Sequence, residues 1–150
     1  MVLGVDDLVR ALPGGDRELG DELSIRIGPD GSVAVGEDFR RAEASWYQGL
    51  AAIGRAGTGL IVDEVFLGGQ SSQKRLARAF DGLAVFWVGV HCAPEVAAAR
   101  EVRRPDRAAG MALSQAESVH NGVRYDMVVD TTSASAQSCA RAIAERVAEL

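Results

Sequence analysis

The segment at residues 59–69, GLIVDEVFLGG, constrains the fold of this chain more than any other stretch. Its apolar residues 60–62 follow one another without alternation, which is typical of a strand buried on both faces of a parallel sheet. Asp63 and Glu64 follow directly, and a pair of glycines ends the segment. Because ligands of open α/β sheets bind beyond the carboxyl ends of the strands, these acids are candidates for contact with a ligand or metal. A solvated charge that ends the strand is the simpler interpretation of Asp63.

Length and composition are those of one domain with a hydrophobic core, since 47% of the 150 residues are hydrophobic. The formal net charge of -5 gives no general attraction to nucleic acid or to anionic membranes. The longest apolar run, 83–90, is too short to span a bilayer, and the first residues show no export signal. Cys92 and Cys139 are too few for a disulfide framework. We therefore expect a cytoplasmic protein without nucleic-acid or membrane partners.

Strands and helices are expected to alternate along the chain. Apolar runs that indicate strands lie at 2–5, 60–63, 83–92 and 125–130. Apolar residues at helical spacing predict helices at 38–56, 70–80, 94–104 and 108–119, and a closing helix that ends near 147. Two alternating segments, 24–27 and 32–35, flank the turn residues GPDG and predict a β-hairpin that extends over a site. This alternation implies βαβ crossovers, and therefore an α/β fold with a parallel sheet.

Asp6 stands between the first expected strand and the helix that follows it, and two roles are open to it. Asp6 or Asp7 occupies the place of a helix N-cap, ahead of the segment LVRAL. The other role is that of a carboxylate at the C-terminal edge of a strand, placed to take a proton from a bound hydroxyl. From the residues alone, capping is the simpler interpretation.

Arg103, Arg104 and Arg107 form the best local candidate for phosphate chemistry. Guanidinium groups at this spacing can bind phosphate oxygens bidentately and neutralise charge in phosphoryl transfer. A solvated basic loop is an equally good interpretation of these arginines.

A phosphate-binding loop is the next candidate, and the only lysine of the chain, Lys74, tests it. The segment GGQSSQKR at 68–75 follows a strand, as such a loop would. However, Gln73 stands where the second glycine should be, and Arg75 stands where Ser or Thr must hold the metal. The segment is therefore not a phosphate loop. His91 and His120 likewise lie in no recognisable nucleophile motif.

Several blocks of the sequence resemble those of the chloramphenicol phosphotransferases, in order and with compatible spacing. The longer blocks are GVD at 4–6, IVDEVFLGG at 61–69, VFWVGV at 85–90 and DRAAGM at 106–111. The shorter ones are VH at 119–120, GV at 122–123, YD at 125–126 and VDTT at 129–132. Members of that family are ATP-dependent kinases that phosphorylate the 3-hydroxyl of chloramphenicol and so inactivate the antibiotic. The resemblance implies a three-layer P-loop kinase-like parallel sheet with flanking helices. It also implies ATP and Mg²⁺ as cofactors, and chloramphenicol or a similar hydroxylated small molecule as the acceptor.

The resemblance assigns roles to particular residues. Asp6 matches the proposed general base of the family, so the resemblance favours the catalytic role over capping alone, and one carboxylate could serve both. Arg104 and Arg107 match arginines that contact the phosphates of ATP, and Arg107 would act in catalysis. Asp63 and Glu64 lie at the acidic strand end, where a carboxylate could reach magnesium.

Phe39, Trp46 and Phe66 are expected to face the acceptor pocket, by position and character only. The spacing of Trp46 along its helix is also that of an ordinary core residue.

One departure from the family is large. Members begin with a strand and a glycine-rich phosphate loop that have no counterpart here, and in such folds that strand lies between the ones expected at 60–63 and 83–92. Without that strand, buried backbone groups of its neighbours would lose their hydrogen-bond partners, and each loss would cost about 1–3 kcal/mol of stability. The free energy of unfolding of a whole domain is only about 5–15 kcal/mol. Two hypotheses remain open. The sequence belongs to a longer kinase, or it is a non-catalytic remnant that binds a small molecule or a partner without phosphoryl transfer.

Overall fold

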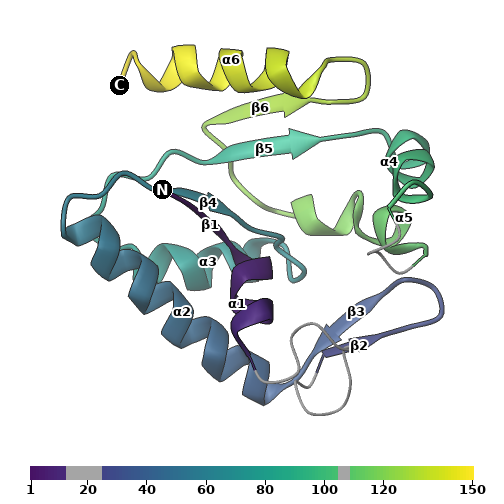
Figure 1. Ribbon diagram of the computed structural model, residues 1–150, viewed down its shortest axis with the longest axis horizontal. Coiled ribbons are helices and arrows are strands. Elements are labelled where there is room, and N and C mark those ends of the chain that lie inside the picture. Colours follow the sequence, from purple (N-terminus) through teal and green to yellow (C-terminus); the bar gives the residue numbers. More distant parts are fainter. Residues whose placement is uncertain (13–24, 105–108) are drawn as a thin grey trace.

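The computed structural model describes residues 1–12, 25–104 and 109–150, and Figure 1 shows the arrangement of its helices and strands. The strands are β1 (Val2–Gly4), β2 (Ile25–Ile27), β3 (Val33–Val35), β4 (Ile61–Asp63), β5 (Val88–His91) and β6 (Met127–Asp130). The helices are α1 (Val5–Ala11), α2 (Glu37–Arg55), α3 (Gln70–Ala79), α4 (Pro94–Glu101), α5 (Met111–Gln115) and α6 (Ala136–Val147), with a 3-10 turn, η2, at Ser118–His120. None of these described helices has the length and apolar character needed to cross a membrane.

The parallel strands form two separate pairs. β1 runs parallel to β4, with Gly4 beside Asp63, and β5 runs parallel to β6, with His91 beside Asp130. These pairings confirm the predicted α/β fold with parallel strands. Among the described residues, no strand hydrogen-bonds to both β4 and β5, so the two pairs do not join into one sheet. In Figure 1, α6 lies along β6 on one side, and α2 and α3 lie on the far side of β1 and β4.

The main core lies between β4 and the helices α2 and α3. Leu50 and Tyr47 of α2 are almost fully buried, and they pack with Leu76 of α3 and with Phe66 from the segment that follows β4. Apolar residues at helical spacing therefore predicted both helices to within one residue at each end, since 38–56 and 70–80 were expected. Burial of this apolar area contributes roughly 25 cal/mol per Å².

The predicted hairpin is present, and β2 pairs antiparallel with β3. Its tip is closed by Asp30, whose carboxylate accepts hydrogen bonds from the backbone N–H and the hydroxyl of Ser32 at 3.0 and 2.6 Å. Gly31 completes the turn with φ of +76°, a conformation that favours glycine. Ile25 of β2 packs with Leu8 and Phe39 in a second core cluster, so the hairpin packs against α1 and α2.

Several elements are shorter than predicted, and β5 and the helix expected at 108–119 differ most. β5 begins at Val88 rather than near 83, because Leu83 and Val85 pack against the main core and no described strand runs beside them. The helix predicted at 108–119 is broken into α5 and η2. The hydroxyl of Ser118 donates to the carbonyl of Ser114 at 3.0 Å, and such local bonds compete with a regular helix.

Candidate functional site

The candidate site lies at the carboxyl ends of β1 and β4. Because the two strands are parallel and Gly4 lies beside Asp63, α1 begins at the same edge where the acids of the GLIVDEVFLGG segment emerge. The contact between the two strand ends is close. A Cβ atom at position 4 would lie 2.7 Å from the carbonyl oxygen of Asp63, so only glycine fits there. The glycine thus brings Asp6, in the first turn of α1, to the edge that carries Asp63 and Glu64.

The structure assigns capping of α1 to Asp7 and not to Asp6. Gly4 is the N-cap residue, and its backbone N–H donates to Asp7 Oδ2 at 2.8 Å, as in a capping box. Asp7 Oδ1 also accepts from Arg10 at 3.1 Å. Asp6 is exposed, and its carboxylate accepts no hydrogen bond from a described residue. Asp6 therefore does not cap α1, because Asp7, at the N3 position, is the residue that reaches back to the N-cap, and the role of Asp6 as a base stays a prediction.

Glu64 is half-buried and faces α2, where the Tyr47 hydroxyl donates to its Oε2 at 3.1 Å. Its Oε1 is buried and accepts no hydrogen bond from a described residue. Burial, aided by the nearby charges of Glu43 and Asp63, raises the pKa of Glu64 to about 7, although the bond from Tyr47 and the charge of Arg75 oppose this rise. Burial, followed by the charges of Glu64 and Glu43, raises the pKa of Tyr47 above its usual value. This pair can therefore hold a proton near neutral pH.

Glu43 connects this pair to α3. It is 5% exposed, and its carboxylate accepts from Arg40 at 2.8 and 3.0 Å and from Arg75 at 3.0 Å. These ion pairs line a groove of about 230 Å³ between α2 and α3. Sequence reasoning missed Glu43 and Tyr47, although their spacing of four residues places them on one face of a helix.

The three aromatic residues expected at an acceptor pocket lie in different surroundings. Phe39 is 5% exposed in the second core cluster, and Phe66 is 8% exposed in the main core, 6.1 Å from the ring of Trp87. Trp46 packs against both clusters, and its indole Nε1 is buried without a hydrogen bond to a described residue. Trp46 is therefore the one of the three that has an unused polar group.

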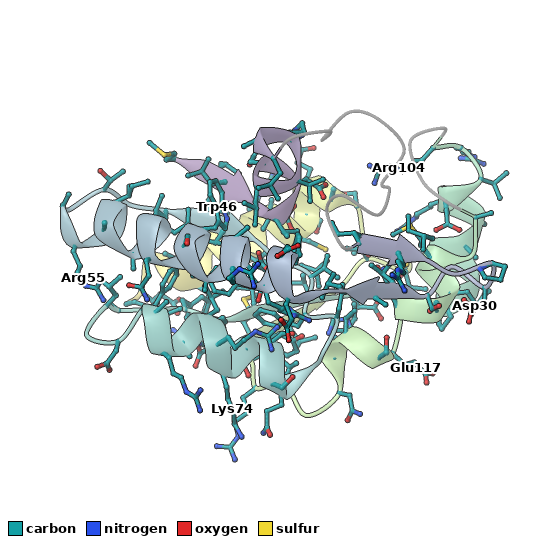
Figure 2. All side chains as sticks on the ribbon, turned by 90° about the horizontal axis from the view of Figure 1, so that it is seen from below. Asp30, Trp46, Arg55, Lys74, Arg104 and Glu117 are labelled. Carbon is teal, nitrogen blue, oxygen red and sulfur yellow. The ribbon has the colours of Figure 1, made fainter. Side chains whose placement is uncertain are left out.

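The arginines expected to contact phosphates follow α4. Arg104 is exposed, and its backbone N–H donates to the carbonyl of Glu101 at 2.7 Å. Arg107 lies outside the described residues. Figure 2 shows Arg104 on the side of the molecule where α1 lies, whereas Lys74 projects from the opposite side. Lys74 is exposed and donates to Gln70 at 3.1 Å, in agreement with its exclusion from a phosphate loop.

Metal binding at this edge would require oxygen atoms from a bound molecule in addition to those of the protein. In the described part of the chain, no three residues among His, Cys, Asp and Glu are grouped so that they could hold a metal ion. Mg²⁺ usually takes one or two carboxylates together with phosphate oxygens and water. The exposed carboxylate of Asp63 fits that pattern, whereas Glu64 shares one oxygen with Tyr47 and buries the other.

Comparison with known proteins gives the same family as the motifs. Residues 1–148 match the family described as “Chloramphenicol phosphotransferase-like protein”. Two curated relatives from Mycobacterium tuberculosis, from strain CDC 1551 / Oshkosh and strain ATCC 25618 / H37Rv, carry names that begin “Putative O-phosphotransferase”. Each is 34% identical over 114 residues, which are 76% of this chain and 50% of the relative. The chain thus spans about half the length of these relatives. With its parallel strand pairs and a family match over residues 1–148, the chain belongs to the chloramphenicol phosphotransferase-like family.

Proposed function

We propose that this chain supplies the proton-accepting and acceptor-binding part of an ATP-dependent O-phosphotransferase. The acceptor is the 3-hydroxyl of chloramphenicol or the hydroxyl of a similar small molecule, and the product is an inactivated antibiotic. Family membership and the names of the M. tuberculosis relatives support phosphotransfer as the class of reaction. The observation that carries the proposal is the carboxylate of Asp6, which is exposed at the strand edge while Asp7 caps the helix.

In the proposed reaction, Asp6 accepts the proton of the acceptor hydroxyl as that oxygen attacks the γ-phosphorus of ATP. A bond forms between the acceptor oxygen and the γ-phosphorus, and the bond to the β,γ-bridging oxygen breaks, so that ADP leaves. A general base of this kind contributes about 10²–10⁴-fold to the rate. Asp6 is suited to this role because none of the described residues occupies its oxygens.

Positive charge for the phosphates would come from Arg104 and Arg107. Arginine binds phosphate oxygens bidentately and neutralises charge that develops during transfer. Asp63 would be the residue at this edge to hold magnesium bound with ATP, since its carboxylate is exposed, and the ion would supply further neutralisation of phosphate charge. Glu64 is better suited to hold a proton than a cation, because burial favours its neutral form.

The acceptor is proposed to bind near Trp46, between α1 and α2. The buried indole Nε1 is a donor that a hydroxyl, nitro or carbonyl oxygen of the acceptor could use. Phe39 and Phe66 would then support this site from the two core clusters.

The test uses the protein expressed from its complete reading frame, incubated with ATP, Mg²⁺ and chloramphenicol. We expect chloramphenicol to gain one phosphoryl group in mass spectrometry, and ADP to appear in equal amount. The Trp46→Phe variant, which keeps an aromatic ring and removes the Nε1 donor, should raise KM for chloramphenicol with little change for ATP. If chloramphenicol stays unmodified while other hydroxylated compounds are phosphorylated, the acceptor is wrong and the reaction class is right.

A non-catalytic binding protein is the second candidate, and one observation favours it. The chain contains a single lysine, Lys74, and no glycine-rich phosphate loop. Such a protein would bind the small molecule or a partner without transferring phosphate. Calorimetry with chloramphenicol separates the candidates, because binding without any phosphorylated product supports this second function and contradicts the first.

A further inference from the structure

Glu101 is the last residue of α4, and its side chain joins α4 to the start of α5. Oε2 accepts a hydrogen bond from the backbone N–H of Gly110 at 2.8 Å, and Oε1 accepts one from Ala112 at 2.7 Å. Both oxygens of one carboxylate are thus used by the start of α5. Hydrogen bonds from backbone N–H groups to an ionised carboxylate are among the stronger ones in proteins.

The same residue also holds the backbone of Arg104. The carbonyl oxygen of Glu101 accepts from the N–H of Arg104 at 2.7 Å, and the neighbouring carbonyl of Arg100 accepts from Arg103 at 3.2 Å. Glu101 therefore binds Arg104 through its main chain and Gly110 through its side chain. Glu101 is thus a direct link between the backbone of Arg104 and the start of α5.

The hairpin of β2 and β3 packs against the start of α5 at Gly110. Gly110 has φ of +87°, and a Cβ atom at that position would lie 3.1 Å from the carbonyl oxygen of Asp30. A Cβ atom at Gly31 would overlap the backbone of Gly110 and Met111. In Figure 1, α5 lies between α4 and this hairpin. The start of α5 is therefore confined on both sides, so a bond from Glu101 to it fixes α4 and Arg104 against a supported element.

We propose that Glu101 is a positioning residue for phosphate binding, which holds Arg104 where it can contact ATP. The inference rests on the proposed function, since it assumes that Arg104 meets phosphate there. Glu101 does not touch the substrates in this account. It acts on the orientation of the arginine, and misplacement of a binding group by about 1 Å can cost about 100-fold in rate.

The test compares Glu101→Ala and Glu101→Gln with the control variant Glu95→Ala. Glu95 lies in the first turn of the same helix and is exposed. The first readout needs no activity: amide hydrogen exchange at Gly110 and Ala112 should become about tenfold faster or more in Glu101→Ala. It should change less in Glu101→Gln, which keeps one acceptor oxygen, and not at all in Glu95→Ala.

The second readout is the split of kinetic constants in the phosphotransfer assay. Glu101→Ala should raise KM for ATP or lower kcat by about 10–100-fold, with KM for the acceptor unchanged and with partial rescue in Glu101→Gln. Faster amide exchange with unchanged kinetics would overturn the proposal, because Glu101 would then be structural only. Unchanged amide exchange would also overturn the proposal, because the hydrogen bonds from Gly110 and Ala112 to Glu101 would then not hold the start of α5. If the wild-type protein transfers no phosphate to any acceptor, the proposed function fails and this inference fails with it. The amide exchange data then show separately whether the Glu101 side chain holds the start of α5.

Discussion

The side-chain amide of Gln73 and the backbone of Arg124 are joined by two hydrogen bonds that run in opposite directions. Gln73 Nε2 donates to the carbonyl of Arg124 at 2.6 Å, and Gln73 Oε1 accepts from its N–H at 3.0 Å. Gln73 is 8% exposed. It therefore joins α3, which packs under β4, to the segment that leads into β6. Gln73, one of the two residues that exclude a phosphate loop in the sequence, thus links α3 to the segment ahead of β6 in the structure.

Loss of this link should destabilise the protein. Gln73→Ala leaves the N–H and the carbonyl of Arg124 without their partners, so we expect the free energy of unfolding to fall by about 2–3 kcal/mol. Urea unfolding measures this change. The control is Lys74→Ala, which removes an exposed neighbour and should change stability by less than about 0.5 kcal/mol. Equal effects of the two substitutions would contradict the role given to Gln73.

The two adjacent acids of α1 should have separable effects. Asp6→Asn is expected to lower kcat for phosphotransfer by about 10²–10⁴-fold with little change in ATP affinity or in thermal stability. Asp7→Ala should instead cost about 1 kcal/mol of stability, because it removes the acceptor of the Gly4 N–H. Steady-state kinetics and thermal unfolding of both variants test this division. Normal turnover by Asp6→Asn would show that its carboxylate is not the base.

Glu64 should make stability depend on pH. Its pKa rises to about 7 on folding from an ordinary value of 4.5, so the native state holds more protons than the unfolded state between these values. The free energy of unfolding should therefore fall as pH rises through that window, by at most about 3 kcal/mol at about 1.4 kcal/mol per unit.

The measurement is urea unfolding of wild type and Glu64→Gln across that pH range. Burial lowers the pKa of His120, which produces a slope of opposite sign, so the contribution of Glu64 is the difference between the two proteins. Identical pH profiles would mean that Glu64 titrates normally in the folded state.

Residues 1–150 alone should bind ATP poorly. Lys74 donates to Gln70 on the side of the molecule opposite to Arg104, and the chain offers no other lysine for phosphates. We expect calorimetry with ATP and Mg²⁺ to show affinity weaker than micromolar and assays to show no turnover. Micromolar binding would contradict this and would require a different nucleotide site.

The separation of the two strand pairs predicts a feature of the coding DNA. β4 and β5 each have a second edge that no described strand occupies, and a parallel strand between them would complete a continuous sheet. We expect the reading frame ahead of Met1 to encode an apolar strand followed by G-x-x-x-x-G-K-[ST]. Sequencing of that region tests this, and an in-frame stop codon immediately upstream would favour the non-catalytic remnant.

The parts of the fold that depend on local periodicity could be predicted from the sequence. α2 and α3 were placed correctly because their apolar residues recur at helical spacing, and the hairpin because its turn residues are distinctive. The helix predicted at 108–119 was wrong in its extent, because α5 begins only after its N-cap residue Gly110, which has a positive φ, and because the Ser118 hydroxyl bonds back to Ser114 where η2 begins. Neither effect changes the pattern of apolar residues.

The site could be predicted only in part, because its details depend on contacts between distant segments. The sequence placed Asp6, Asp63 and Glu64 at one edge, but a choice between Asp6 and Asp7 as the cap needs the backbone geometry of α1. The bond from Tyr47 to Glu64 joins residues 17 positions apart. It could not be read from residue type alone, and neither could the roles of Gln73 and Glu101.

The separation of the strand pairs also affects how the protein unfolds. Neither cluster of buried core residues includes a residue of β5, β6 or α6. In these three elements the buried apolar side chains are those of Val129 and Cys139. Cooperativity in small domains comes from a core that all elements share, whereas regions with few buried apolar contacts open at lower cost. The C-terminal strand pair and α6 should therefore open locally, with faster amide hydrogen exchange than the helices around Leu50, ahead of the global unfolding transition.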